Sequence, residues 1–576
     1  MPETFSEQLA ARLDAALAGT PFAEELPEGF EAQIDPAQNP RFGDYQSNAA
    51  MILAKQVKRN PREVAAAAIE AFDGGDLCET PEIAGPGFVN FRIKTEALEA
   101  RLREQLADPE RLGVPAVSAP KTIVADFSAP NVAKPMHVGH IRSTIIGDAL
   151  VRVARFLGHE VVADNHIGDW GTQFGMIIWG WKHLVDEAAL EADPVPEMLR
   201  VYREVNAKTK EDESLREACK NELVKLQQGD AENLAIWERC VELSRIGLQK
   251  IYDRLDVHFD HWLGESFYND RLEPLVDDLL EKGIAEESDG AICVFFPEVE
   301  ALADKPALIR KSDGGFLYAT TDLATIDYRI DEFDADAIWY VVGAPQQLHF
   351  EQIFLVSKKR GQKADLQFIP FGSILGKDRK MLRTRSGDTV QLADVLAEAV
   401  ERAYRIVEEK NPELDEEQKR EIAETIGIGS VKYAELSQFR MTDYIFDWDN
   451  MLSLKGNTAP YLLNAYVRTR AIFRKLGSDF EPGGDIALTA DAEKALALKL
   501  AQFAEIVPAV LDDFRTNALA AYLYELATTY HKFWEACPVL RAEGAVRETR
   551  LALCELTGRV LRCGLGLLGI RTTEKM

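Results

Sequence analysis

The chain contains 576 residues, 46% of them hydrophobic and 28% charged, which is ordinary for a globular protein with three or four domains of about 100–200 residues each. Its formal net charge of −29 argues against nucleic-acid binding by the surface as a whole, although local clusters of Lys and Arg occur. No apolar run could cross a bilayer, the first residues lack a signal-peptide pattern, and the seven scattered cysteines form no CxxC pair; we therefore expect a cytoplasmic protein with no membrane segment, disulfide framework or cysteine-rich zinc site.

The first part of the chain, residues 1–116, is predicted to be an α+β N-terminal domain. Helical patterning in "SEQLAARLDAALAG" is followed by the turn "NPRFGDYQSN", by further helices, and by "EIAGPGFVNFRI", which is typical of a strand pair with glycine turns. The Pro-containing segment "LADPERLGVPAVSAPK" is typical of a linker and ends this domain.

A parallel sheet is predicted next, in residues 117–392. The apolar strand "KTIVADFSAPN" precedes a helix in which apolar residues recur at helical spacing until Gly158, which stands where a C-cap belongs. "HEVVADNHIGDWGTQ" supplies another strand and a glycine-rich turn. Strand, helix and strand form a βαβ unit, so we expect a Rossmann-like α/β domain with a nucleotide-type crevice.

The rest of the chain divides by pattern into an insertion and a helical end. A charged, helical stretch begins near Leu184 and opens an insertion at about 184–300. Strand signals then occur in "AICVFFPE", "ALIRKS", "GGFLYATTDLA" and "AIWYVVGA". Residues 393–449 are predicted to be a helical connecting region, and residues 450–576 an all-α C-terminal domain.

Two histidines, His137 and His140, stand in the sequence HVGH between the first strand and the helix of the βαβ unit. A zinc protease would place them four residues apart with a Glu between, and a structural histidine is the usual role of an isolated one. The strand–turn–helix context favours a third interpretation. A helix N-terminus attracts anions, imidazoles donate hydrogen bonds to phosphate, and Gly139 allows close approach, so we predict an ATP site.

Several ordered blocks of sequence resemble the arginyl-tRNA synthetases, which are class I enzymes with an ATP motif written HIGH. These blocks are "DFSAPNVAKPMHVGHIRSTIIGDALVRVARFLGHEV", "DNHIGDWGTQFG", "LYATTDLA", "YVVGAPQQLHF", "GSILGKDRKMLRTRSGDTVQL" and "GNTAPYLLNAYVRTR". The resemblance implies an arginine–tRNA ligase that uses ATP with accompanying Mg²⁺ to make arginyl-adenylate and pyrophosphate, then transfers arginine to the 3′-terminal ribose of tRNA. We also expect a monomer with no metal site of its own.

For the reaction itself, the resemblance assigns His137, His140 and Lys134 as catalytic and Gly139 as ATP-binding. Adenylate formation needs positioning and charge stabilisation rather than an acid, a base or a nucleophile. The second class I motif, KMSKS, is altered here, and the resemblance implies that Lys134 compensates for it. ATP-binding residues of the altered motif are expected at Met381, Arg383, Thr384 and Arg385.

For arginine, the resemblance places carboxylates and a tyrosine around the guanidinium, which prefers planar carboxylate partners. Tyr318 and Asp322 are four residues apart and would share a helix face, although spacing alone favours a helix cap for Asp322. Because such a pocket penalises lysine and citrulline by several kcal/mol, no editing domain is expected. The implied arginine-binding residues are Asp126, Asn131, His137, Tyr318, Asp322 and Gln346.

Transfer RNA is expected to contact both ends of the chain. The N-terminal domain resembles the domain that touches the D-loop corner, and the helical end resembles an anticodon-binding domain. Stacking on aromatic rings and phosphate contacts by arginines would supply the binding. Tyr530 and Trp534 have an equally good interpretation as helix-packing residues. The expected contacts are Asn39, Phe42, Tyr461, Arg468, Tyr530, Trp534 and Met576.

Two other functions fit parts of the pattern. Another class I synthetase, or a nucleotidyltransferase without tRNA, would end soon after the second motif, which the long helical end argues against. A non-catalytic RNA-binding relative would have lost parts of the ATP site, yet Lys134, His137, Gly139 and His140 are all present.

Overall fold

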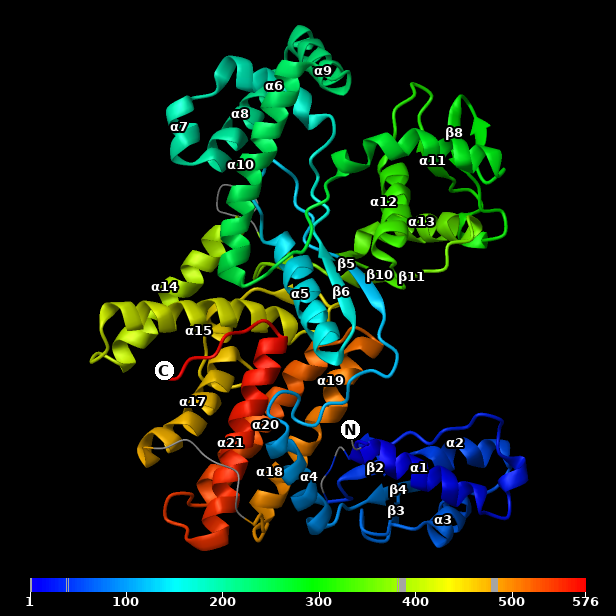
Figure 1. Ribbon diagram of the computed structural model, residues 1–576, viewed down its shortest axis with the longest axis vertical. Helices are drawn as coiled ribbons and strands as arrows, with labels where there is room; N and C mark the ends of the chain where they lie inside the picture. Colours follow the sequence, from blue (N-terminus) through cyan, green and yellow to red (C-terminus); the bar gives the residue numbers. More distant parts are fainter. Residues whose placement is uncertain (1–2, 38, 40, 381, 383–389, 478–484) are drawn as a thin grey trace. The chain divides into compact units, whose positions relative to one another are not determined.

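The computed structural model describes residues 3–37, 39, 41–380, 382, 390–477 and 485–576. The chain forms two compact units, each coloured along the sequence in Figure 1. The first unit combines residues 1–116 with residues 454–566 and 571–576, and the second contains residues 117–453 with residues 567–570. None of the described helices is long and apolar enough to cross a membrane.

The N-terminal part of the first unit is a small antiparallel sheet with helices. Its strands run in the order β1–β2–β4–β3. Helix α1 begins at a capping box in which Thr4 and Glu7 exchange hydrogen bonds, and α3 begins with Pro61 after the N-cap Asn60. The elements are α1 (Phe5–Ala18), η1 (Ala23–Glu25), β1 (Asp35–Pro36), β2 (Tyr45–Ser47), α2 (Ala49–Gln56), α3 (Pro61–Ala71), β3 (Glu82–Ala84), β4 (Phe88–Phe91) and α4 (Thr95–Ala107). The expected strand pair near residue 85 is confirmed.

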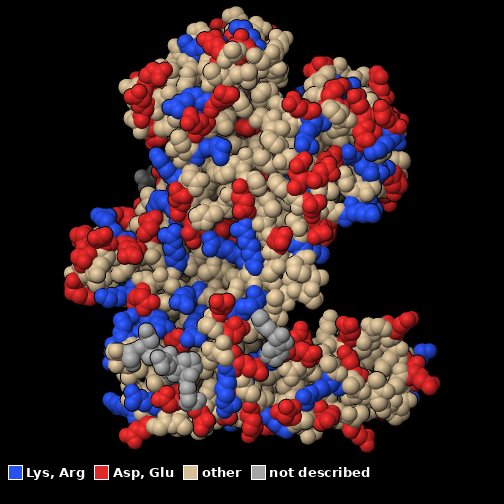
Figure 2. Space-filling model, viewed as in Figure 1, with Lys and Arg blue, Asp and Glu red and all other residues tan. Residues whose placement is uncertain are grey.

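The other part of the first unit is a bundle of helices. Thr458 caps α17, whose apolar face is buried against α20, and α18 also packs on α20. Basic and acidic side chains alternate over most of the face in Figure 2, with Lys and Arg gathered around α17. The helices are α17 (Ala459–Leu476), α18 (Asp491–Ala501), α19 (Phe503–Asp512), α20 (Thr516–Ala536) and α21 (Gly544–Leu567).

A four-stranded parallel sheet, in the order β11–β10–β5–β6, forms the centre of the second unit. Helix α5 connects β5 to β6, as the βαβ pattern predicts. It ends at the C-cap Gly158, whose φ of 101° is readily adopted only by a residue without a side chain. In the register, Asp126 stands beside Asp164 on one side and Tyr340 on the other. The bounds are β5 (Thr122–Asp126), α5 (Gly139–Leu157), β6 (Glu160–Asp164), β10 (Ala337–Gly343), η4 (Ala344–Gln346), α13 (Gln347–Lys359) and β11 (Asp365–Phe371).

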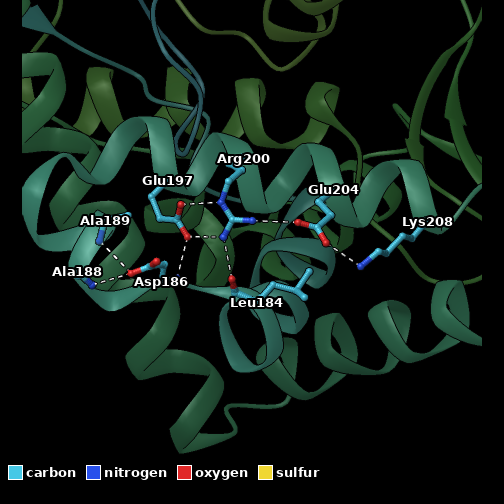
Figure 3. Close-up of polar contacts among 8 residues, drawn as sticks. All are labelled: Leu184, Asp186, Ala188, Ala189, Glu197, Arg200, Glu204 and Lys208. Carbon is cyan, nitrogen blue, oxygen red and sulfur yellow. Dashed lines mark hydrogen bonds and ion pairs between the residues drawn. The ribbon is translucent and has the colours of Figure 1, made fainter.

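Helices α6–α10 follow β6 and group together in Figure 1. Arg200 of α8 bridges Glu197 and Glu204, and Lys208 extends the chain of ion pairs, so charges along α8 are neutralised within the insertion (Figure 3). Asp186 caps α7, the helix before α8, by accepting hydrogen bonds from two backbone N–H groups. The helices are α6 (Gln173–Leu184), α7 (Glu187–Ala192), α8 (Pro194–Lys208), α9 (Glu213–Gln227) and α10 (Ala231–Leu255).

A three-stranded antiparallel sheet, β7–β8–β9, and its helices precede the return to the parallel sheet. The strand signal in "GGFLYATTDLA" is wrong, because apart from one bridge at Phe316 the segment becomes helix α12 from Tyr318 onward. The elements are η2 (Glu265–Tyr268), α11 (Asn269–Glu281), β7 (Glu286–Ser288), β8 (Ala291–Val294), η3 (Glu300–Leu302), β9 (Ala307–Arg310) and α12 (Tyr318–Phe333).

The last part of the second unit is helical and ties onto α5 through buried charges. Arg142 of α5 donates from Nε to Oε1 of Glu435 at 2.6 Å, and both side chains are almost completely buried. Arg142 also donates to the carbonyl oxygens of Arg440 and Thr442, so one guanidinium anchors the loop after α15. The elements are β12 (Ile374–Leu375), α14 (Leu392–Lys410), α15 (Glu416–Leu436), β13 (Tyr444–Ile445) and α16 (Trp448–Met451).

Candidate active site

The carboxyl edge of the parallel sheet gathers most of the predicted site residues. Strand β5 has β6 on one side and β10 on the other, so the order of the strands reverses at β5. Open α/β sheets bind ligands in the crevice outside the carboxyl ends of the strands at such a point. Residues 127–138 leave β5 toward α5, and residues 344–346 follow β10. HVGH and Gln346 therefore begin from neighbouring strand ends.

The backbone hydrogen bonds around HVGH determine which nitrogen of each imidazole carries the proton. The N–H of Gly139 donates to Nδ1 of His137 at 3.1 Å, and the N–H of His137 donates to Nδ1 of His140 at 3.1 Å. Each Nδ1 is therefore an acceptor, which leaves the proton of the neutral ring on Nε2. Burial lowers the pKa of both rings, that of His140 to about 4. At neutral pH the rings, 4.0 Å apart, are two uncharged N–H donors.

The N-terminus of α5 differs from the expectation of free N–H groups. The N–H groups of Gly139, His140 and Ile141 all donate within the turn, to Nδ1 or the carbonyl oxygen of His137 and to the carbonyl oxygen of Val138. A Cβ on Gly139 would lie 2.8 Å from Cε1 of His137, so any larger residue at this position would force the ring of His137 to shift. The hydrogen bonds that this turn can offer a phosphate thus come from the imidazoles rather than from the helix backbone.

The segment that follows the second motif is hydrogen-bonded through its backbone to the segment that carries HVGH. The N–H of Val138 donates to the carbonyl oxygen of Val390 at 2.9 Å, and Leu392 donates to that of Met136 at 2.9 Å. The segment that ends the altered KMSKS block is therefore paired with the segment that carries HVGH. The predicted ATP-binding residues of that block, Met381, Arg383, Thr384 and Arg385, lie outside the described residues.

Lys134 lines a cavity of about 900 Å³ between the insertion and α14. Its Nζ lies 5.1 Å from the ring centroid of Tyr202, which fits a cation–π contact. Three other cations of the lining are paired with carboxylates: Arg200 with Glu197 and Glu204 (Figure 3), Arg239 with Glu242, and Arg254 with Glu424.

Tyr318 and Asp322 lie on one face at the start of α12, as their spacing predicts. Tyr318 is 68% exposed, and Asp322 accepts a hydrogen bond from Nε2 of His349. Burial, together with the charges of Asp169 and Asp322, raises the pKa of Glu265 to about 7. The pKa of Tyr318 is raised mainly by burial and, to a smaller extent, by the charge of Glu265. Glu265 and His349 thus join the predicted pair. Glu265 lies in none of the quoted sequence blocks, whereas His349 lies in "YVVGAPQQLHF" but was assigned no role.

Asp126 has a different environment from the one expected. It is 6% exposed, and its Oδ2 accepts from Nη2 of Arg329 at 2.8 Å, so the carboxylate already has a guanidinium partner inside the protein. The two polar residues predicted for the ends of arginine are accessible. Asn131 is exposed beside Gly168, with which it forms a β-bridge, and Gln346 is exposed at the end of η4.

The predicted RNA contacts of the first unit have different exposures. Asn39 organises its turn by accepting from the N–H of Phe42 and, through Oδ1, from that of Arg41, and the ring of Phe42 is 55% exposed. In the helical bundle Tyr530 is fully buried, within hydrogen-bonding reach of Cys554 at 4.0 Å. Tyr530 is therefore a packing residue, and the expectation that it contacts RNA is corrected because no part of its side chain reaches the surface.

Three of the remaining predicted contacts, Tyr461, Arg468 and Trp534, form a half-buried cluster around His531. Arg468 lies within 3.0 Å of Nδ1 of His531 and 5.9 Å from the ring of Trp534. The ring of Tyr461 meets that of His531 edge-on at 5.0 Å. Met576, at the end of the chain, is also half-buried. An arginine among aromatic rings is typical of a surface that stacks bases.

Comparison with known proteins covers nearly the whole chain. The model of "tRNA synthetases class I (R), catalytic domain" matches residues 101–448, the "DALR anticodon binding domain" residues 462–576, and the "Arginyl tRNA synthetase N terminal domain" residues 4–93. Proteins named arginine--tRNA ligase from Chromobacterium violaceum and Thermobifida fusca are 44% and 46% identical, over 100% and 99% of both chains.

Two solved arginyl-tRNA synthetases are similar. The Plasmodium falciparum enzyme has a TM-score of 0.84 at 28% identity and covers 100% of this chain and 99% of its own. The Thermus thermophilus enzyme has a TM-score of 0.85 at 24% identity and covers 99% and 100%.

Proposed function

This chain belongs to the arginyl-tRNA synthetase family, and from that premise we propose which of its residues carry out the reaction. It is an ATP-dependent arginine–tRNA ligase: the arginine carboxylate attacks the α-phosphorus of ATP, pyrophosphate leaves, and a ribose hydroxyl of tRNA then displaces AMP. The observation that carries the assignment is the pair of neutral imidazoles beyond the carboxyl end of β5, in which each Nδ1 accepts a backbone hydrogen bond and each Nε2 carries the proton. Catalysis of this kind needs donors aimed at developing negative charge.

We propose that His137 and His140 donate hydrogen bonds to the phosphates as charge accumulates on them. Because both rings stay neutral at pH 7, they act as donors and not as acids. Lys134 precedes the turn and adds a fixed positive charge. Mg²⁺ would arrive with the triphosphate, because it usually keeps several waters and binds through the substrate phosphates.

For arginine, we propose that the guanidinium binds Asp322, Tyr318 and Glu265. Asp322 and Glu265 approach closely enough for the charge of one to raise the pKa of the other, which is unfavourable until a cation lies between them. Lysine offers a point charge without the planar fork, and citrulline offers no charge, so both leave a carboxylate unsatisfied. Asn131 and Gln346, both exposed, are proposed for the amino and carboxylate ends.

For tRNA, we propose two contact regions in the first unit. One is the turn at Asn39, which presents the ring of Phe42 to solvent, and the other is the cluster of Tyr461, Arg468 and Trp534 on α17 and α20. Met576, which is half-buried, is proposed as a further contact. Exposed aromatic rings stack unpaired bases, and the arginine can meet a phosphate. We further propose that the enzyme acts as a monomer in the cytoplasm.

Asp322→Asn tests the arginine site. The matched control is Asp331→Asn, an exposed carboxylate on the same helix. In pyrophosphate exchange with tRNA present, Asp322→Asn should raise the KM for arginine about tenfold to a hundredfold, the value of one or two charge-assisted hydrogen bonds, and leave the KM for ATP unchanged. Equal weakening of both substrates, or the same effect from Asp331→Asn, would contradict the assignment.

A further inference from the structure

Helix α12 carries a stripe of three polar residues that connects the crevice with the core. Tyr318, Asp322 and Arg329 are separated by four and seven residues, so all three lie on one face. Asp322 and Arg329 are two turns apart, about 10 Å along the axis. Tyr318 is 68% exposed, whereas the side chain of Arg329 is completely buried. The face that presents the proposed arginine ligands therefore ends in an arginine of the protein itself.

Arg329 fastens α12 to the carboxyl edge of the sheet. Its Nη2 lies 2.8 Å from Oδ2 of Asp126 and 2.8 Å from Oδ2 of Asp164, and its guanidinium lies 5.5 Å from the ring centroid of Tyr340. Asp126, Asp164 and Tyr340 stand at one level of the register, at or near the ends of β5, β6 and β10. One side chain thus joins the helix to three neighbouring strands.

The charges of this cluster depend on Arg329. Asp126 and Asp164 are neighbours with almost no exposure, so two ionised carboxylates would repel each other without a cation. Burial raises the pKa of Asp126, and Arg329 and His166 oppose that rise. The two carboxylates raise the pKa of Arg329 far above its usual value, so the guanidinium stays charged. Without Arg329, the carboxylates of Asp126 and Asp164 would either repel each other or become partly protonated. Helix α12 would also lose its ion pairs with β5 and β6.

We propose that Arg329 is a positioning residue for arginine recognition, which sets the depth and rotation of α12 by its ion cluster with Asp126 and Asp164. Asp126, whose Oδ2 is held by Arg329, then influences substrate binding through the position of α12, whatever contact its other oxygen makes. Specificity for the guanidinium rests on Asp322 and Glu265. The inference depends on the proposed arginine site at Tyr318 and Asp322, because that is the site whose position Arg329 would fix.

The test is a double-mutant cycle on the full-length protein with Asp126→Asn, Arg329→Met and the two combined. The KM for arginine, the KM for ATP and kcat are measured by pyrophosphate exchange with tRNA, beside the thermal midpoint. Because a misplacement of about 1 Å can cost up to a hundredfold, Arg329→Met should raise the KM for arginine at least about tenfold while the KM for ATP changes little. The double variant should be no worse than the poorer single variant, since both remove one cluster.

Arg360→Met is the matched control. Arg360 is also largely buried, and it also holds α12, by ion pairs with Asp327 at 2.6 Å and with Asp278 of α11 at 3.2 Å. Asp327 lies on a different face of α12 from Asp322, being five residues away. The control should lower the thermal midpoint without a selective rise in the KM for arginine. An equal selective rise in the control would overturn the proposal, because any loosening of the helix would then suffice.

Other outcomes distinguish a failure of the positioning role of Arg329 from a failure of the proposed arginine site. An unchanged KM for arginine in Arg329→Met, or a double variant whose effect is the product of the single effects, would overturn the positioning role. If Arg329→Met does not fold, Asp164→Asn decides, because Asp164 is completely buried and cannot touch substrate. A selective rise in the KM for arginine is expected from it, and none would overturn the inference. If Asp322→Asn itself has no effect on arginine, the proposed arginine site fails first.

Discussion

The backbone N–H of His137 donates to Nδ1 of His140 at 3.1 Å, so the turn itself decides which nitrogen of the second imidazole carries the proton. The same arrangement recurs between Gly139 and the ring of His137. A protonated ring would lose the acceptor that each of these bonds requires. The geometry therefore favours two neutral donors, in agreement with the lowered pKa of both rings.

This geometry predicts a difference between two substitutions of His140. Because the free donor is Nε2, the amide nitrogen of glutamine can approximate its position, whereas that of asparagine is closer to the position of Nδ1. His140→Asn should lower kcat for arginyl-adenylate formation about 10²–10³-fold, as expected for loss of a transition-state donor, and His140→Gln should retain more activity. Single-turnover kinetics measure both.

The same prediction has a consequence for pH. With a pKa of about 4, His140 does not change charge between pH 6 and 8, so the ratio of wild-type to His140→Gln kcat should be constant over that range. A ratio that changes through pH 6.5 would show that the ring acts in its protonated form and would contradict the donor role.

Glu265 predicts a pH dependence for arginine use. Its pKa of about 7 lies above the ordinary value of 4.5, so the folded protein holds this proton where the unfolded chain has lost it. Its contribution to stability is complete below pH about 4.5 and is lost as the pH rises through about 7. Guanidinium binding favours the carboxylate and therefore releases the proton. The KM for arginine should rise as the pH falls below 7, by up to about tenfold per pH unit.

Glu265→Gln is the variant that isolates this effect. It should have a higher KM for arginine at pH 8 and a much flatter profile between pH 6 and 8. The KM for ATP, measured in the same series, corrects for any pH dependence of tRNA binding or of the phosphates. If wild type and Glu265→Gln have parallel profiles for arginine, another group is responsible for the dependence.

The sequence predicted the parts of the site that local contacts build. Residues 122–158 form strand, turn and helix because their apolar spacing, Gly139 and Gly158 all act within a few residues. The partner of Asp126 could not be predicted, since Arg329 is 203 positions away and an isolated arginine carries no signal. The strand signal at residues 314–324 was wrong for a related reason. Aromatic and β-branched residues favour a strand, but the buried face of α12 meets the core and overrides that preference.

Phe42 offers a test of the proposed RNA contact in the N-terminal domain. Its ring is 55% exposed, and stacking on a base is worth about 1–3 kcal/mol, so Phe42→Ala should raise the KM for tRNA about fivefold to a hundredfold. The KM for arginine at saturating tRNA should not change. Ile52→Ala, at another exposed apolar side chain of the same domain (42% exposed), is the control and should leave the KM for tRNA unchanged. If both substitutions raised the KM for tRNA equally, the rise would not be specific to Phe42, and the proposed stacking contact would be contradicted.

Tyr530 and Trp534 lie four residues apart on α20, and they separate packing from RNA binding. Tyr530 is fully buried, so Tyr530→Ala should cost about 3–5 kcal/mol of unfolding free energy, in line with other large-to-small aromatic substitutions. Trp534 is half-buried beside Arg468, so Trp534→Phe should cost little stability and yet raise the KM for tRNA. Urea unfolding followed by aminoacylation at several tRNA concentrations measures both. Tyr530→Phe keeps the ring and removes the hydroxyl, and it should leave the KM for tRNA unchanged; a rise would mean that the bundle opens to expose Tyr530 when RNA binds.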